Sequence, residues 1–479
     1  MGALEQLEPK RVFRFFEELS AIPRGSGNTK AVSDWCMAFA AERGLEAHQD
    51  ALNNVIIIKE ASAGYEQAEP VIVQGHLDMV CERAPGCTLD MEHQGLELAV
   101  EGDTVLARGT TLGADDGIAV AMALAILDDD TLAHPRVEAV FTVDEEIGML
   151  GAAALDVSPL RGRRMLNIDS EVEGVLTVGC AGGNVTACTL PIAREAWPGT
   201  VLRITVGGLQ GGHSGTEIDK GRGNANVLLG RVLWALRRQT ELRLISADGG
   251  SKDNAIPRES TAVLTAADPE AVRAVCAELD RQLKAEFASA DPDVFVTVCA
   301  AETDRPAMTD ESTGRAVCFL NCLLNGVQVM SADMPGLVES SLNLGILVTE
   351  EARICASYCV RSSVESAKNA MTEKLRCLTA QLGGSVEVSG DYPGWAYRPD
   401  SPLRALMTQV FREQYGREPE VSAVHAGLEC GLFAGKLPGL DCVSFGPDLP
   451  EIHTCRERMH IASVGRVWNM VVEVLRRMR

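Results

Sequence analysis

Short runs of continuous apolar residues alternate with segments of helical periodicity over residues 1–183. The apolar runs predict buried strands at NVIIIKE, VIVQG, VEAVFTV and RMLNID, which begin at Asn54, Val71, Val137 and Arg164. The helical segments are 11–19, 30–43, which stops at Gly44, and 115–127, whose body is wholly apolar. Continuous apolar strands separated by helices predict an α/β domain with a mostly parallel sheet.

The pattern changes at residue 184. Strands such as VLRITVGG and TAVLTAA alternate apolar and polar residues, with helices at 224–238 and 269–287 between them. This alternation predicts an α+β domain with an antiparallel sheet that exposes one face. The stretch GDYPGWAYRPDSP is rich in turn-forming residues and predicts a loop that ends this domain. The first pattern then returns, with predicted helices at 402–415 and 463–478 and predicted strands EVSAVH and LDCVSFG. We therefore predict one α/β domain, residues 1–183 and 392–479, interrupted by an inserted domain, residues 184–391.

Composition and charge restrict the partners. The 479 residues are 46% hydrophobic and 23% charged, the profile of a globular protein with more than one core. The formal net charge of −23 argues against nucleic acid and anionic membranes, because both attract basic surfaces. The longest apolar run, IAVAMALAIL, has ten residues and is too short to span a bilayer. The N-terminal segment is typical of an amphipathic helix rather than an export signal, so we expect a cytoplasmic protein.

The fifteen cysteines include no C-x-x-C pair. In a chain without an export signal, free thiols are the expected state. Two C-x3-C pairs, Cys318 with Cys322 and Cys355 with Cys359, have no histidine nearby. We therefore interpret these four residues as small hydrophobic side chains rather than as a metal site.

Polar residues gather where the predicted strands end. They are His76 and Asp78 after VIVQG, Asp144, Glu145 and Glu146 after VEAVFTV, Asp169 and Glu171 at the end of RMLNID, Asp115 and Asp116 before the apolar helix, and His453 after LDCVSFG. Ligands of open parallel sheets bind beyond the carboxyl ends of the strands. Converging carboxylates raise one another's pKa, and a bound cation removes their repulsion. Histidine with carboxylates suits Zn²⁺, and this many ligands predicts two ions that share a bridging carboxylate.

Each of these residues alone favours a plainer interpretation. A single histidine at a strand end is seldom a ligand, two aspartates before a helix usually cap it, and DEE after a strand is usually a solvated turn. The combination favours the metal site, because there are five such sites, each at an appropriate strand or helix end, in a chain with eight histidines.

Seven segments carry a resemblance to a known family. They are GHLDMV, ARGTTLGADDGIAVAMALAIL, TVDEEIGMLGA, NIDSEVEG, GGHSG, NAIPRE and HAGLECG. Together they resemble the dinuclear zinc exopeptidases of the aminoacylase/carboxypeptidase type, from the N-terminal helix to the last helix. Within that family they are most similar to bacterial dipeptidases that cleave aminoacyl-histidine. The resemblance implies a mostly parallel α/β catalytic domain of phosphorylase/hydrolase-like zinc exopeptidase topology, with an inserted α+β lid domain.

The resemblance also implies roles for the residues at the strand ends. Two Zn²⁺ ions per chain, with Mn²⁺ or Co²⁺ as alternatives, would be bound by His76, Asp115, Glu146, Asp169 and His453. Asp115 would bridge both ions, with a strained and commonly cis peptide bond to Asp116. Asp78 would hydrogen bond to His76 and fix its tautomer. Glu145 would be the general base.

In the lid, the resemblance assigns His213 of GGHSG as a hydrogen-bond donor to the oxyanion. Asn254 of NAIP and Arg361 of CVRSS would bind the C-terminal carboxylate of the substrate, for which arginine has a suitable geometry. Taken alone, a histidine in a glycine loop and an arginine on a strand are usually solvated. His425 and Glu429 of HAGLECG would lie in a loop that lines the substrate site.

The function that the resemblance implies is hydrolysis of short peptides with a free C-terminus, Xaa-His dipeptides and β-alanyl-histidine among them. A tripeptidase and an N-acyl amino acid deacylase are alternatives with the same metal chemistry. An inactive metal-binding scaffold is disfavoured because Glu145 stands beside Glu146, and a nicotinamide-binding protein because no strand is followed by G-x-G-x-x-G.

Two points stay open at the level of the sequence. Relatives place a proline two residues after the final ligand, as in H-S/T-P, whereas HTCRERM has Cys455 there, which leaves that loop less rigid. Relatives also use the lid for dimerisation, and some donate the lid histidine in trans. Two arrangements are therefore open. The protein is a homodimer, or its long insertion supplies His213 in cis.

Overall fold

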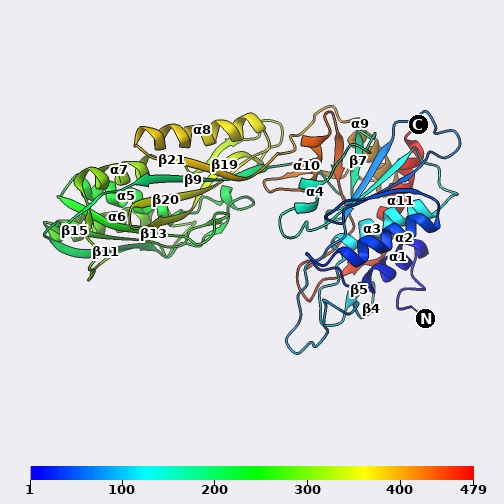
Figure 1. The fold of residues 1–479 in the computed structure, drawn as a ribbon, viewed down its shortest axis with the longest axis horizontal. Coiled ribbons are helices and arrows are strands. Elements are labelled where there is room, and N and C mark those ends of the chain that lie inside the picture. Colours follow the sequence, from blue (N-terminus) through cyan, green and yellow to red (C-terminus); the bar gives the residue numbers. More distant parts are fainter. Residues whose placement is uncertain (1) are drawn as a thin grey trace. The chain divides into compact units, whose positions relative to one another are not determined.

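The computed structural model describes residues 2–479, which form two compact units (Figure 1). The first unit contains the residues up to Gly179 together with Tyr397–Ala423 and Leu428–Arg479. The second, which we call the inserted unit, contains Cys180–Ala396 and the short segment Val424–Gly427. The chain therefore leaves the first unit for a long insertion and a second time for four residues.

An eight-stranded sheet organises the first unit, in the order β1-β2-β6-β3-β7-β23-β8-β22. Its strands are β1 (Glu46–Gln49), β2 (Val55–Lys59), β3 (Val71–His76), β6 (Val137–Thr142), β7 (Arg164–Asn167), β8 (Val175–Cys180), β22 (Glu420–Val424) and β23 (Asp441–Ser444). The four central strands β6, β3, β7 and β23 run parallel. Strands β1, β2 and β8 pair antiparallel toward the edges. The predicted α/β fold with a mostly parallel sheet is confirmed.

Helices pack on this sheet and a small sheet accompanies it. The helices are α1 (Lys10–Ser20), α2 (Lys30–Glu42), α3 (Ala114–Asp128), α4 (Leu150–Ala154), α9 (Pro402–Tyr415), α10 (Glu429–Lys436) and α11 (Ile461–Arg477). The small sheet contains β4 (Leu98–Glu101), β5 (Thr104–Ala107) and β24 (Met459–His460). Helix α3 contacts β3 and α1, and α9 contacts β23 and α11 (Figure 1).

Helix α3 is apolar on all sides because protein surrounds it. The buried Lys59 closes its C-terminal end, where Nζ donates to the carbonyl oxygens of Ile126, Leu127 and Asp129 at 3.3, 3.0 and 3.0 Å. At the other end, α3 lies so close to β3 that a Cβ atom on Gly75 would come within 2.6 Å of the side chains of Ala119 and Asp116. The start of α3 is thereby held against the end of β3.

The inserted unit is built on a nine-stranded antiparallel sheet, in the order β16-β11-β15-β13-β19-β20-β9-β21 with β18 beside β19. These strands are β9 (Gly182–Pro191), β11 (Thr200–Gly207), β13 (Leu242–Gly249), β15 (Ser260–Ala266), β16 (Phe295–Ala300), β18 (Gly326–Met330), β19 (Val338–Thr349), β20 (Arg353–Ser362) and β21 (Ser385–Tyr392). Two short pairs complete it, β10 (Arg194–Glu195) with β17 (Ala307–Met308) and β12 (Gly212–His213) with β14 (Ala255–Ile256).

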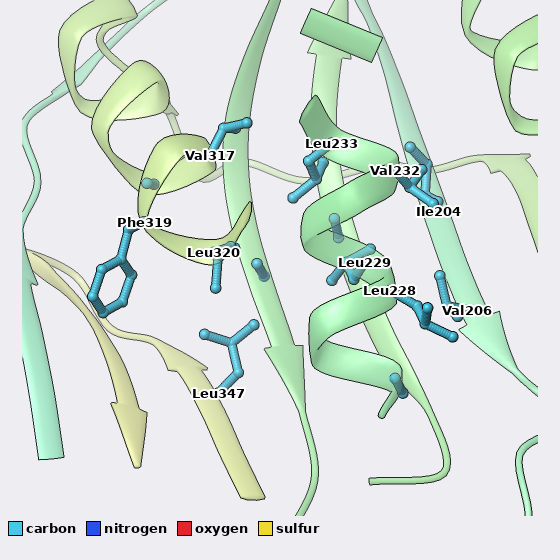
Figure 2. Close-up of a cluster of buried hydrophobic side chains, with 14 of the residues drawn as sticks. Ile204, Val206, Leu228, Leu229, Val232, Leu233, Val317, Phe319, Leu320 and Leu347 are labelled. Carbon is cyan, nitrogen blue, oxygen red and sulfur yellow. The ribbon is translucent and has the colours of Figure 1, made fainter. Parts of the chain in front are cut away.

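Helices cover the inserted sheet and bury its core. They are α5 (Ala225–Arg237), α6 (Pro269–Glu286), α7 (Asp310–Cys322) and α8 (Glu365–Gln381), with the 3-10 turn η1 (Ile218–Lys220). Figure 2 shows apolar side chains of α5 and α7, Leu229 and Leu320 among them, pointing toward Ile204 of β11 and Leu347 of β19. Helices α5, α6 and α7 are each preceded by an N-cap residue whose side chain accepts hydrogen bonds from N–H groups of the first turn. These residues are Asn224, Asp268 and Thr309.

Two further expectations concern the whole chain. All fifteen cysteines are free among the described residues, as the sequence predicted. Within residues 2–479, no helix is both long enough and apolar enough to cross a membrane.

Candidate active site

The four parallel strands bring the predicted ligands to one edge of the sheet. His76 is the last residue of β3, and Asp169 follows β7 by two residues. Glu146 lies in the loop after β6, and His453 in the loop after β23. Because the carboxyl ends of neighbouring parallel strands share an edge, residues far apart in sequence converge there.

Asp115 stands between the two histidines. Its Oδ1 lies 3.1 Å from Nε2 of His76, and its Oδ2 lies 3.0 Å from Nε2 of His453. Glu146 Oε2 is 3.0 Å from the same His453 nitrogen, and Asp169 Oδ1 is 3.7 Å from His76 Nε2. Each oxygen of one carboxylate therefore faces a different imidazole, and each imidazole has a second carboxylate beside it.

The loop before α3 gives Asp115 this orientation. The peptide bond between Asp115 and Asp116 is cis, and neither residue has helical dihedral angles, so the regular helix begins only after them. Asp116 is buried and its Oδ2 accepts a hydrogen bond from the backbone N–H of His76 at 3.2 Å. It also lies close to His76 and Asp169.

The cluster fits divalent cations. Two sets of side chains, His76, Asp116 and Asp169 in one and Asp115, Glu146 and His453 in the other, have donor atoms within 4.8 Å of one another. Burial and then the neighbouring Asp116 raise the pKa of Asp169 well above its ordinary value. Oε1 of Glu146 is buried and has no hydrogen-bond partner among the described residues. Imidazole nitrogen with carboxylate oxygen is a donor set that suits Zn²⁺ and similar ions, which would neutralise these acids.

Glu145 stands beside this cluster with a different environment. Burial raises its pKa to about 7, and the nearby carboxylates of Glu146 and Asp115 add to this while His76 opposes it. A carboxyl group with such a pKa exchanges protons near neutrality, as a general base must.

Asp78 links His76 to the loop after β6. Its Oδ1 is 3.5 Å from Nδ1 of His76 and accepts a hydrogen bond from the backbone N–H of Glu145 at 3.1 Å. Its Oδ2 accepts from the Ser26 hydroxyl at 2.8 Å and from the N–H of Glu146 at 3.4 Å. One fully buried carboxylate thus orients an imidazole and two glutamates.

Glu429 is buried behind the cluster, at the start of α10. Its Oε2 accepts hydrogen bonds from Nε2 of Gln74 at 2.6 Å and from the Thr142 hydroxyl at 2.7 Å, and its Oε1 has no partner among the described residues. Burial, and then the charge of Glu145, raise the pKa of Glu429 to about 8. The carboxyl group is therefore protonated at neutral pH.

A cavity of about 760 Å³ in the first unit reaches Glu146 and Ile147. Ser26, Met79 and Met91 form other parts of its wall. Cavities of this size accommodate small molecules, so the first unit offers space for a substrate next to the cluster.

In the inserted unit, His213 and Asn254 line a groove of about 800 Å³. Nδ1 of His213 accepts hydrogen bonds from the backbone N–H groups of Gly215 and Thr216 at 3.3 and 3.2 Å. Burial, and then Arg361, lower the pKa of His213. Because Nδ1 accepts, the proton of the neutral ring is on Nε2, which is therefore a hydrogen-bond donor.

Arg361 and His425 belong to the same region of the inserted unit. Nη1 of Arg361 donates to the Tyr392 hydroxyl at 3.2 Å, whereas its buried Nε has no partner among the described residues. Nε2 of His425 is 2.7 Å from the Ser341 hydroxyl. Burial, and then Arg361, lower the pKa of His425 to about 4, so this imidazole is neutral. The predicted substrate residues thus gather in the inserted unit, with the exception of Glu429.

A model of peptidase family M20/M25/M40 matches residues 72–477. The chain therefore belongs to this family, whose peptidases depend on metal ions, and the resemblance inferred from the sequence is confirmed. The cytosol non-specific dipeptidase of Escherichia coli (strain K12) is 36% identical over 480 residues, which cover 99% of both chains.

Solved structures agree with this assignment. The crystal structure of aminoacylhistidine dipeptidase from Vibrio alginolyticus is similar with a TM-score of 0.94 and 36% identity, over 98% of this chain and 97% of that chain. Aminopeptidase PepT from Bacillus cereus is similar with a TM-score of 0.55 and 16% identity, over 98% of this chain and 99% of that chain, which shows a shared fold.

Proposed function

We propose that this protein is a dipeptidase that binds two divalent metal ions, with Zn²⁺ as the first candidate and Mn²⁺ or Co²⁺ as alternatives. The carrying observation is Asp115, whose two oxygens face different histidines at 3.1 and 3.0 Å. A carboxylate in this position is suited to bridge two ions, one beside His76 and one beside His453. The names of the E. coli and Vibrio relatives support a dipeptidase, and aminoacyl-histidine substrates including β-alanyl-histidine.

The proposed ligands are His76, Asp115 and Asp169 for one ion and Asp115, Glu146 and His453 for the other. Bound there, the ions supply Lewis acidity toward the peptide carbonyl and lower the pKa of the attacking water. Glu145 accepts the proton of that water and delivers it to the nitrogen of the leaving amine. Its pKa of about 7 suits both transfers. Asp78 holds His76 and Glu145 in place, because its carboxylate lies beside Nδ1 of His76 and accepts a hydrogen bond from the backbone N–H of Glu145.

Two further steps belong to the inserted unit, for which we propose the role of a lid. His213 donates from Nε2 to the oxyanion, since its Nδ1 is occupied by backbone N–H groups. Arg361 binds the C-terminal carboxylate of the substrate, because its buried Nε retains an unused donor. Asn254 assists from the groove that it shares with His213, and neutral His425 lines the same region.

The test is a panel of four related substrates. It compares a Xaa-His dipeptide with its C-terminal amide, a tripeptide and an N-acetyl amino acid, with metal content measured on the same sample. We expect the free dipeptide to be hydrolysed best and amidation to lower kcat/KM by about 10²-fold or more, as expected when a buried charged group loses its partner. Arg361→Ala should cause a similar loss for the free dipeptide and little further loss for the amide.

The same panel decides between the proposal and its alternatives. Faster hydrolysis of the tripeptide would indicate a tripeptidase, and faster hydrolysis of the N-acetyl amino acid a deacylase. An equal effect of Arg361→Ala on the dipeptide and its amide would remove Arg361 from the proposed carboxylate site. A protein that binds metal and cleaves none of these substrates would support the scaffold alternative.

Location and assembly complete the proposal. A cytoplasmic location is supported by the word cytosol in the name of the E. coli relative. For assembly, the alternatives are a chain in which His213 serves its own site and a homodimer in which His213 acts in trans. Mixing Glu145→Gln protein with His213→Ala protein separates the two, because only the homodimer should recover activity.

A further inference from the structure

Two buried charged residues hold the loops of the proposed metal site from behind. They are Arg24, which lies between α1 and α2 in sequence, and Glu457, which follows His453 by four residues. Each is 2% exposed, and neither belongs to the sets of side chains whose donor atoms converge. Both hydrogen bond to the backbone of Gly113, two residues before Asp115, because Arg24 donates to its carbonyl oxygen and Glu457 accepts from its N–H group.

Glu457 ties the loop of His453 to the loop of Asp115. Its Oε2 accepts hydrogen bonds from the backbone N–H groups of Leu112 and Gly113 at 2.7 and 3.0 Å, and its Oε1 accepts from Ala114 at 2.8 Å. Three successive N–H groups therefore point at one carboxylate. Hydrogen bonds to a charged acceptor are stronger than neutral ones, so this contact fixes the backbone that leads into Asp115.

Arg24 ties the same loop to the end of β3. Its Nη1 donates to the carbonyl oxygens of Leu77 and Asp78 at 2.9 and 3.1 Å, and its Nη2 donates to the carbonyl oxygen of Gly113. The guanidinium fills the space beside Gly113, where a Cβ atom would lie 2.6 Å from Nη2. Gly113 also has a φ of +65°, which favours glycine. The planar fork of arginine reaches all three carbonyl groups, which a lysine ammonium could not match.

We propose that Glu457 and Arg24 are positioning residues that set the metal affinity of the site, each mainly for a different ion. Both residues hold the backbone before Asp115, which the two proposed ions share. Glu457 also anchors the loop of His453 and so serves mainly the ion of Asp115, Glu146 and His453. Arg24 also holds the backbone after His76 and so serves mainly the ion of His76, Asp115 and Asp169. Outer partners of metal ligands act in this way by restricting the ligands to the binding geometry. This inference rests on the proposed metal site but does not depend on which substrate is cleaved.

The first unit contains a matched control at the opposite end of its sheet. Glu138 is also fully buried and accepts hydrogen bonds from the backbone N–H groups of Arg161 and Gly162 at 3.0 and 2.9 Å and from Nε of Arg136 at 3.0 Å. Glu138→Gln and Arg136→Lys therefore remove buried charge contacts of the same kind, away from the proposed ligands. They measure what loss of such a contact does to folding alone.

The experiment titrates Zn²⁺ into metal-free protein in competition with a chromophoric chelator, which requires no enzymatic activity. Glu457→Gln and Arg24→Lys should each weaken one of the two binding steps by about 10–100-fold, the usual range for outer partners of metal ligands. Glu138→Gln and Arg136→Lys should leave both steps within about threefold of the unchanged protein. Thermal unfolding of the metal-free variants checks that each pair is compared at similar stability.

The same variants made in His453→Ala protein show which binding step belongs to which ion. His453→Ala should remove the step that depends on Asp115, Glu146 and His453 and leave one ion bound. In that background, Arg24→Lys should still weaken the remaining ion by about 10-fold or more. Glu457→Gln should weaken it less than Arg24→Lys does, because Glu457 then acts only through the backbone before Asp115. In the unmodified background, excess Zn²⁺ should restore much of the kcat of Glu457→Gln, which a general loss of structure would not allow.

Several results would overturn the assignment. If Glu457→Gln weakened Zn²⁺ binding no more than Glu138→Gln does, its role would be structural. If both positioning variants weakened both ions equally, the division of labour would be wrong. Should Glu457→Gln fail to fold, Glu457→Asp keeps the charge but is too short to reach all three N–H groups, and unchanged affinity in that variant would also reject the proposal. A protein that binds two ions as expected but cleaves no dipeptide would reject the proposed function and leave this inference standing.

Discussion

At the amino end of the eight-stranded sheet, one buried acid is paired with an arginine and with backbone N–H groups, whereas at the carboxyl end several acids lie together beside two histidines. Glu138, the second residue of β6, accepts hydrogen bonds from Nε of Arg136 and from two backbone N–H groups. Arg136 in turn contacts Glu60 through Nη1. Every acid here has a cation or an N–H group beside it, as buried charges require.

The carboxyl end differs in kind. Its carboxylates face one another and two histidines, and the nearby guanidinium of Arg24 donates to backbone carbonyl oxygens rather than to these carboxylates. Burial raises the pKa of Asp116 and Asp169 well above ordinary values. Acids that are paired inside the chain serve folding, whereas a buried cluster of acids that raise one another's pKa indicates a site that a bound cation would neutralise.

Replacement of Asp115 should have the largest effect, because both proposed ions share it. Asp115→Ala should lower the bound metal from about two ions per chain to nearly none. His453→Ala should remove mainly one ion. Metal analysis after dialysis, with Glu138→Gln as the control from the opposite end, checks both. A fully active protein with a single tightly bound ion would contradict the dinuclear proposal.

Replacement of Glu145 should have the next largest effect, which should lower the rate of hydrolysis and leave the bound metal unchanged. Glu145→Gln keeps the shape of the side chain but cannot accept a proton, so kcat should fall by about 10²–10⁴-fold while both ions stay bound. Glu146→Gln should instead lose metal, because Glu146 lies 3.0 Å from His453 and is a proposed ligand. Steady-state kinetics and metal analysis on the same preparations separate the two. Exchanged phenotypes would reverse the assignment of base and ligand.

The parallel strands and the convergence of polar residues at their ends can be predicted from the sequence. Continuous apolar runs predict the parallel strands, and the polar residues that follow them, such as His76, Glu146 and Asp169, must converge because parallel strands share one edge. The alternation in VLRITVGG likewise predicts an antiparallel strand, which is β11. These predictions succeed because period and strand direction are local or purely topological properties.

Other features depend on tertiary contacts that no pattern shows. Arg24 stands in a loop and Glu457 in HTCRERM, where a charged residue is usually solvated, yet both are buried. Asp116 resembles a helix cap but lies against His76. The segment Val424–Gly427 carries His425 into the inserted unit, although the residues on both sides of it belong to the first. A sequence read along the chain cannot reveal such burial, because the partners come from distant segments.

Glu429 should have a smaller effect, visible in the pH dependence of stability. Its pKa is about 8 in the folded protein and 4.5 in an ordinary environment. Between these values the folded state holds a proton that the unfolded state has released. The contribution of Glu429 to stability should therefore be fully present below about pH 4.5 and fall by up to about 1.4 kcal/mol per pH unit until about pH 8.

Glu429→Gln should remove this contribution. A glutamine oxygen can still accept from Gln74 and Thr142, and its amide has no charge to bury. Urea denaturation of metal-free protein at about pH 5 and about pH 8 measures the difference. The variant should gain stability relative to the unchanged protein at the higher pH and little at the lower one. Parallel pH profiles for the two proteins would mean that Glu429 is ionised when folded.

The smallest functional effect should come from Glu138 itself. A glutamine there retains one acceptor oxygen, but its amide would face N–H donors, so the folded state should lose about 3–5 kcal/mol, as when one partner of a buried ion pair is removed. Glu138 lies four residues before the end of β6. This corresponds to about 13 Å along an extended strand between Glu138 and the edge where the ligands gather. Separate sites at such distances are nearly independent, so kcat and Zn²⁺ affinity should stay within about threefold. Denaturation, kinetics and metal titration on Glu138→Gln test this together. If this variant lost metal affinity as Glu457→Gln is expected to, the two ends of the sheet would be coupled, and the contrast between an acid for folding and acids for function would not hold.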